Sequence, residues 1–146
     1  MTDRFDLQRF VDAQAGVYGD VCAELRDGRK RSHWIWFIFP QLRGLGRSPT
    51  ADRYGITSAQ EACAYLAHPT LGPRLRECTR LVAQIDGRTA EQIFGRPDWL
   101  KVRSSMTLFA EAAADPAGRA DFLAVLDKFY DGAGDPKTLE MLSAAG

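Results

Sequence analysis

The sequence lacks the cysteine and histidine patterns that build disulfide frameworks and zinc sites. It has three cysteines, Cys22, Cys63 and Cys78, and only two histidines, His33 and His68. The cysteines form no CxxC pair, and the histidines are far apart, so no zinc-type ligand spacing exists. We therefore expect no metal and no resident cofactor. Each cysteine falls at an apolar position of a helical pattern, and we expect all three to be buried and reduced.

Long hydrophobic runs and net charge are also absent. The longest apolar run, Trp34 to Phe39, is too short to span a bilayer. The first ten residues carry charges where a signal peptide would need an apolar core. Nineteen basic and nineteen acidic residues cancel, so the overall charge gives no signal for nucleic acid or an anionic membrane. We therefore expect a cytoplasmic protein with neither partner.

The periodicity of apolar residues predicts an all-α fold. The chain has 146 residues, of which 45% are hydrophobic, so residues 1–146 are expected to form a single helical domain. Steps of three and four between apolar positions, together with capping boxes at Ser58 and Thr89, indicate seven or eight helices. Outside the aromatic segment, the predicted helices are 6–26, 58–67, 71–85, 89–95, 99–114, 116–130 and 137–144.

An aromatic segment, residues 30–41 (KRSHWIWFIFPQ), has the most distinctive composition in the chain. Ser32 can cap a helix and Pro40 would end it, so we favour a short helix, with a buried strand as the alternative. Trp34 or Trp36 could stack on a flat ligand, or both could anchor the core.

Two polar side chains frame the aromatic residues. His33 follows three cations that would favour a neutral imidazole, which could act as a base or simply bond to backbone. Gln41 leaves the segment after Pro40 and could orient a ligand or cap a turn.

A second cluster, DWLKVRSS, spans residues 98–105 at the start of a predicted helix. Two cations and two hydroxyls near a helix N-terminus favour an anion such as phosphate, although a solvated helix face is the simpler interpretation. The candidate ligand residues are Lys101, Arg103, Ser104 and Ser105. Later in the chain, Asp135 precedes Pro136 in a glycine-rich turn and could cap a helix or bind a ribose hydroxyl.

The segments RFVDAQ (9–14), KRSHWIWFIFPQ (30–41), GLGRS (44–48), AYLAHPTLGPRLREC (64–78), IFGRPDWLKVRSSMTLF (93–109) and DPKT (135–138) resemble the domain of unknown function 1810 family. This resemblance covers nearly the whole chain and implies a helical cytosolic domain, without an activity. Such proteins are sometimes labelled calpastatin-like, but nothing here resembles an inhibitory disordered repeat.

The chain also has a remote similarity to the NADAR family, helical proteins of NAD and ADP-ribose metabolism that include N-glycosidases. The matching positions are Ala13, Gln14, Gly95, Arg96, Asp98, Trp99, Val102, Arg103, Gly132 and Gly134. The glutamate–histidine pair of that family is replaced by Gln8 and Arg9. The similarity therefore implies ligand binding more readily than catalysis.

These observations lead to the hypothesis of a site for a nucleotide or ADP-ribose-like ligand, with hydrolysis of an N-glycosidic bond as a further step. Hydrolysis would need a carboxylate, for which Asp12, Asp98 and Asp135 are candidates, with His33 as proton carrier. The alternatives are a non-enzymatic binding or regulatory module, and an oligomerisation domain, such as a homodimer, joined through aromatic side chains.

Overall fold

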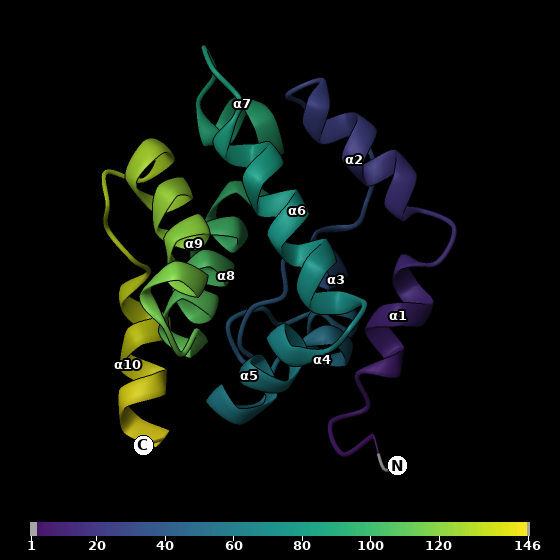
Figure 1. The fold of residues 1–146 in the computed structure, drawn as a ribbon, viewed down its shortest axis with the longest axis vertical. Helices are drawn as coiled ribbons and strands as arrows, with labels where there is room; N and C mark the ends of the chain where they lie inside the picture. Colours follow the sequence, from purple (N-terminus) through teal and green to yellow (C-terminus); the bar gives the residue numbers. More distant parts are fainter. Residues whose placement is uncertain (1–2, 146) are drawn as a thin grey trace.

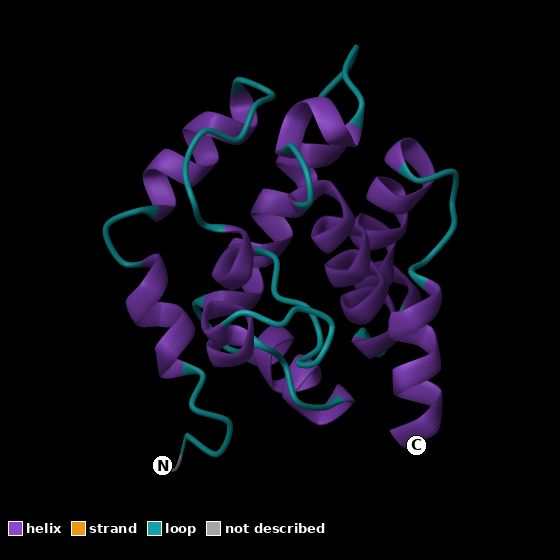
Figure 2. Cartoon of the chain, turned by 180° about the vertical axis from the view of Figure 1, so that it is seen from behind, coloured by secondary structure: helices purple, strands orange, loops and turns teal. Residues whose placement is uncertain are grey.

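A computed structural model describes residues 3–145 and confirms the all-α class. Within that range the chain forms ten helices around one core, and no strand is present (Figures 1 and 2). None of these helices is long and apolar enough to cross a membrane. The helices are α1 (Gln8–Gln14), α2 (Tyr18–Arg26), α3 (Ile35–Ile38), α4 (Pro49–Tyr54), α5 (Ala59–Ala67), α6 (Leu71–Ala83), α7 (Ala90–Phe94), α8 (Asp98–Ala112), α9 (Pro116–Phe129) and α10 (Pro136–Ala145).

Two differences from the sequence prediction explain the larger number of helices. The helix expected over 6–26 is divided into α1 and α2, because Ala15 is extended, with a ψ of 129°, and Gly16 follows it with a φ of +80° that turns the chain. No helix was predicted between the aromatic segment and residue 58, but this stretch contains α4, whose start is capped by the Ser48 hydroxyl and carries Pro49 in its first turn.

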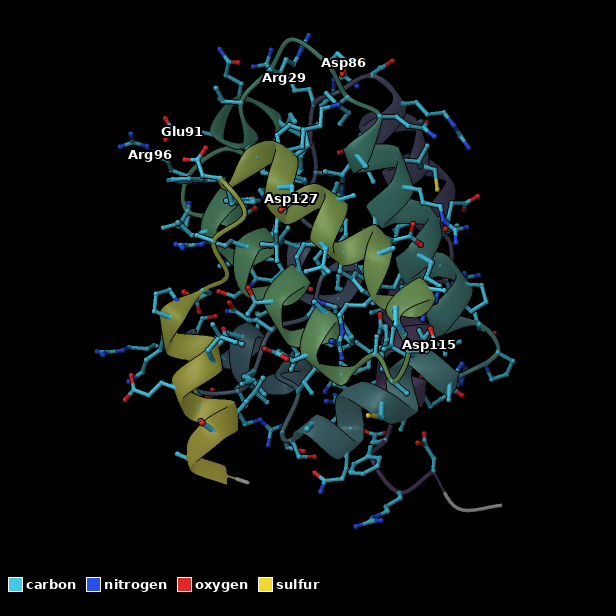
Figure 3. All side chains as sticks on the ribbon, turned by 60° about the vertical axis from the view of Figure 1, so that its left-hand side comes forward. Arg29, Asp86, Glu91, Arg96, Asp115 and Asp127 are labelled. Carbon is cyan, nitrogen blue, oxygen red and sulfur yellow. The ribbon has the colours of Figure 1, made fainter. Side chains whose placement is uncertain are left out.

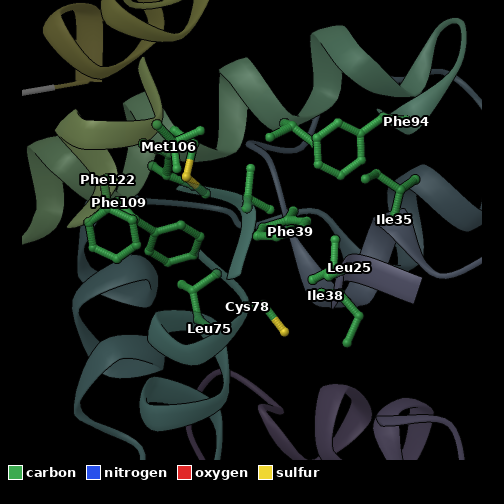
Figure 4. Close-up of a cluster of buried hydrophobic side chains, with 14 of the residues drawn as sticks. Leu25, Ile35, Ile38, Phe39, Leu75, Cys78, Phe94, Met106, Phe109 and Phe122 are labelled. Carbon is green, nitrogen blue, oxygen red and sulfur yellow. The ribbon is translucent and has the colours of Figure 1, made fainter. Parts of the chain in front are cut away.

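Helix α8 is central to the fold and packs against α5, α7, α9 and α10. Its residues from Ser104 to Ala110 are all buried. The ring centroid of Phe109 lies 5.3 Å from that of Tyr65 of α5 and 6.0 Å from that of Phe122 of α9. Figure 4 shows Phe109 beside Phe122 in this core. Charged side chains such as Asp86, Asp115 and Asp127 lie on exposed positions around this core (Figure 3).

The aromatic segment forms the short helix α3, in agreement with the favoured prediction. Trp34 and Phe39 are buried, with 2% and 1% of their surface exposed, and only Trp36 and Phe37 remain partly exposed. The aromatic residues therefore contribute mainly to the core. They do not provide the broad apolar face that an aromatic dimer interface would need.

The environments of the cysteines agree only in part with the prediction. Cys22 and Cys78 are buried, whereas Cys63 is exposed. Cys63 lies on α5, where its thiol donates a hydrogen bond to the Ala112 carbonyl oxygen at 3.3 Å.

Candidate functional site

Three segments that are distant in the sequence meet around an open pocket of about 440 Å³. They are the loop after α3 together with the start of α4, the first two turns of α8, and the start of α10. This volume lies in the range of small-molecule sites. The lining residues are Gln41, Leu45, Gly46, Arg47, Ser48, Ala51, Pro97, Leu100, Lys101, Ser104, Asp135 and Lys137.

The loop that forms one wall is fixed at both ends by backbone hydrogen bonds. Ile56 donates its N–H to the Gln41 carbonyl, and Arg43 donates to the Ile56 carbonyl, both at 2.9 Å. Leu42 and Ile56 thereby form an isolated parallel bridge. These bonds place Gln41 at the base of the loop, at the edge of the pocket.

Gly46 allows this loop to fold tightly. A Cβ atom at Gly46 would lie 2.6 Å from the Ala51 Cβ and 3.3 Å from the Gln41 side-chain nitrogen. The side-chain amide of Gln41 makes no hydrogen bond with any residue from 3 to 145. Its two N–H donors and its carbonyl oxygen are therefore available to a ligand. The Ser48 hydroxyl accepts a hydrogen bond from the Ala51 N–H, which leaves its own proton free to donate.

Lys101 is held at the second wall by a carboxylate and an aromatic ring. Its ammonium lies 3.3 Å from Asp98 and 5.2 Å from the centroid of the Trp36 ring. The other Asp98 oxygen lies 2.9 Å from the Lys30 ammonium, which is 5.3 Å from the Trp34 ring centroid. One carboxylate thus links two lysines, each against a tryptophan, and fixes the position of Lys101.

The third wall depends on contacts between α8 and the glycine-rich turn before α10. Arg103 donates hydrogen bonds to the carbonyls of Ala133 and Gly134, both at 3.0 Å. Thr107 accepts the Asp135 N–H at 2.8 Å. Arg103, predicted to bind a ligand, is therefore engaged in positioning Asp135.

Asp135 caps α10 and also faces the pocket. Its Oδ2 accepts hydrogen bonds from the Thr138 N–H at 3.0 Å and the Thr138 hydroxyl at 2.6 Å. Its Oδ1 has no hydrogen-bond donor among the residues that the structure describes. The capping and ligand interpretations of Asp135 are thus compatible, because each uses a different oxygen.

Several predicted site residues lie outside the pocket. His33 is exposed and makes no hydrogen bond within residues 3–145, and Asp12 is exposed on α1, where it accepts a bond from Gln8. Neither lines the pocket. Ser105 is fully buried, and its hydroxyl has no partner in the described chain.

Trp34 cannot stack on a ligand, because it is buried and donates its indole N–H to Glu24 at 3.0 Å. Burial opposes ionisation of Glu24. Hydrogen bonds from the Ser32 hydroxyl, the Arg31 N–H, Trp34 and the Ser32 N–H outweigh this effect and lower its pKa to about 2. Glu24 therefore anchors the start of the aromatic segment as a carboxylate.

The sequence prediction missed Arg47, Ser48, Leu100 and Lys137. The GLGRS motif was the available signal for the first two, although it lacks the Gly-Lys-Ser/Thr ending of a phosphate loop. Three cations, Arg47, Lys101 and Lys137, line the pocket together with one carboxylate, Asp135, and Lys101 is also paired with Asp98. The described residues contain no cluster of side chains suited to a metal ion.

Comparisons with known proteins agree with the first of the two resemblances seen in the sequence. Residues 4–142 match the family described as "Protein of unknown function (DUF1810)". The fold is similar to the crystal structure of the conserved hypothetical protein Rv1873 from Mycobacterium tuberculosis, with 60% sequence identity and a TM-score of 0.93. The similarity covers 97% of this chain and 99% of that one. A search of curated proteins found no match. The chain therefore belongs to the DUF1810 family.

Proposed function

We propose that this protein binds a small phosphorylated ligand of the nucleotide or ADP-ribose type in the pocket between the loop, α8 and α10. The observation that carries the proposal is that three cations line one open pocket together with two groups that can still form hydrogen bonds. These groups are the side-chain amide of Gln41 and the Oδ1 atom of Asp135. Cations with adjustable side chains suit phosphate, and an amide and a carboxylate suit hydroxyl groups and ring nitrogens.

The phosphate-binding role is assigned to Lys101, Arg47 and Lys137. Lys101 is held by Asp98 and Trp36, so little side-chain entropy is lost when it contacts an anion. Arg47 and Lys137 are exposed, have no hydrogen bond within residues 3–145, and can approach the ligand from the other two walls. Ser48 adds a hydroxyl donor, whereas the Ser104 proton is already donated to the Leu100 carbonyl.

The hydroxyl-binding role is assigned to Asp135 and Gln41. The free Oδ1 of Asp135 can accept hydrogen bonds from a ribose diol, and Gln41 can both donate and accept. The similarity to NADAR proteins includes Asp98, which is paired with Lys101, and Arg103, which holds the turn before Asp135, and it favours a ligand related to ADP-ribose.

Binding can be tested by titration calorimetry with ADP and ADP-ribose. We expect Arg47→Ala and Lys137→Ala each to weaken binding by about five- to tenfold, since each removes one charged contact to phosphate. Both residues are exposed, so the variants should remain folded. Arg26→Ala removes an equal charge from an exposed position on α2, outside the pocket, and serves as the control. Equal affinities in all four proteins would exclude this pocket as the site.

Hydrolysis of an N-glycosidic bond is a second candidate function, favoured by the Asp135 carboxylate in the same pocket. Asp135 could stabilise positive charge on the anomeric carbon or activate water. Asp98 is less suited, because it is paired with two lysines. We expect Asp135→Asn, which keeps a capping side chain, to abolish release of free base from NAD measured by chromatography. Unchanged release would remove Asp135 from the mechanism.

The alternative of a non-enzymatic binding module uses the same pocket without turnover. The burial of Trp34 and Phe39 supports it, since these residues then serve as core and not as catalytic surroundings. Saturable binding of ADP-ribose with no product after prolonged incubation would favour this alternative.

A further inference from the structure

Leu100 is an exposed apolar side chain in a pocket whose other prominent groups are charged. It has 45% of its surface exposed, and Leu123 and Leu139 are the other two exposed large hydrophobic residues of the described chain. Leu123 lies on α9, and Leu139 lines a hollow beside α8 that has no cation. Leu100 alone of the three shares a pocket with Arg47, Lys101 and Lys137.

Leu100 belongs to an apolar ledge that also contains Pro97 and Leu45. Pro97, Leu100, Lys101 and Ser104 follow one another at steps of three, one and three, so they occupy one face of the first two turns of α8. Leu45 adds apolar surface from the loop that faces this helix. The ledge therefore adjoins Lys101 in the lining of the pocket.

This arrangement fits a ligand in which an apolar, flat group is attached near a phosphate. A sugar phosphate would leave the ledge in contact with water, whereas the base of a nucleotide would cover it. We infer that Leu100 is a specificity-determining residue that contacts the base and selects nucleoside phosphates over sugar phosphates. This inference rests on the proposed phosphate site.

The inference can be tested with two compounds that differ only by the base, AMP and ribose 5-phosphate. Calorimetric titration of the full chain should show AMP binding about tenfold more tightly, as expected for burial of half a leucine side chain against a base. Leu100→Ala should weaken AMP binding by about five- to tenfold and change ribose 5-phosphate binding by less than twofold. Leu123→Ala, the same substitution at a similarly exposed helical position, should change neither.

Each other outcome overturns a defined part of the reasoning. Equal affinities of AMP and ribose 5-phosphate for the unmodified protein would overturn the role of Leu100 and leave the phosphate site intact. An equal loss for both compounds in Leu100→Ala would show a general effect on the pocket and would also overturn base selection. Binding of neither compound would overturn the proposed function itself. Circular dichroism of each variant would confirm that the helices are retained.

Discussion

Glu24 offers a stringent test of how the aromatic segment is held in place. Its carboxylate accepts hydrogen bonds from the Arg31 and Ser32 N–H groups, the Ser32 hydroxyl and the Trp34 indole. Its pKa in the folded chain is about 2, compared with 4.5 for an unperturbed glutamate. Because the folded pKa is lowered, the carboxylate stabilises the fold above pH 4.5, and this contribution is lost as the pH falls towards 2.

The size of the effect follows from the pKa difference. At pH 7 the lowered pKa corresponds to about 3 kcal/mol of stability. Glu24→Gln keeps an oxygen for the N–H donors but loses the charge, so we expect the free energy of unfolding to fall by about 2 to 3 kcal/mol at pH 7. Near pH 3 the unmodified protein has lost about half of this contribution or more. The difference in the free energy of unfolding between the two proteins should therefore be smaller than at pH 7.

Urea unfolding followed by tryptophan fluorescence at pH 7, 4 and 3 would measure these differences. Glu111→Gln is a matched control, because Glu111 is exposed and makes no hydrogen bond within residues 3–145. The reasoning is refuted if Glu24→Gln unfolds within about 0.5 kcal/mol of the unmodified protein at pH 7. A difference in the free energy of unfolding that is as large at pH 3 as at pH 7 would refute the role assigned to the Glu24 charge.

Three further substitutions test other parts of the structure. Ser105→Ala removes a buried hydroxyl that has no partner, so calorimetric melting should show unchanged stability or a gain of up to about 1 kcal/mol, and a loss above 1 kcal/mol would show a missing hydrogen bond. Gly46→Ala places a Cβ 2.6 Å from Ala51, so we expect urea unfolding to show a loss of stability of about 1 to 3 kcal/mol and phosphate binding to weaken. The control Gly19→Ala has no atom within 4 Å of the added Cβ and should preserve stability and phosphate binding. Arg103→Lys removes the paired hydrogen bonds to residues 133 and 134, so we expect weaker ADP-ribose binding in calorimetry with helix content retained; undiminished binding would contradict its positioning role.

The helices were predictable because their signals are local. The capping box at Thr89 is present with both hydrogen bonds, and the Ser58 hydroxyl accepts the Glu61 N–H as expected. The Glu61 carboxylate, however, binds Thr57 and Arg9, a partner 52 residues away. A capping motif identifies where a helix begins, but it does not reveal which distant residue will compete for its side chain.

The candidate site was predictable only where polar residues cluster in the sequence. Lys101 and Ser104 stood out because they lie together near the start of a helix, and Asp135 because of its glycine-rich turn. Lys137 is an isolated exposed cation, and only the folded chain places it in the same pocket as Lys101. Trp34, for which ligand stacking and a core role were both left open, has the core role. Its hydrogen-bond partner, Glu24, lies in the preceding helix, and the sequence gives no sign of this contact.

The bridge between Leu42 and Ile56 has a consequence for how the pocket could diversify during evolution. Because the ends of the intervening segment are joined to each other, a change of length in its exposed part at Arg43 and Gly44 need not displace α3 or α5. The entropic cost of closing a loop rises only slowly with its length. The helical scaffold with Lys101 and Asp135 can therefore remain constant while the wall that contains Arg47 and Ser48 changes in size and chemistry.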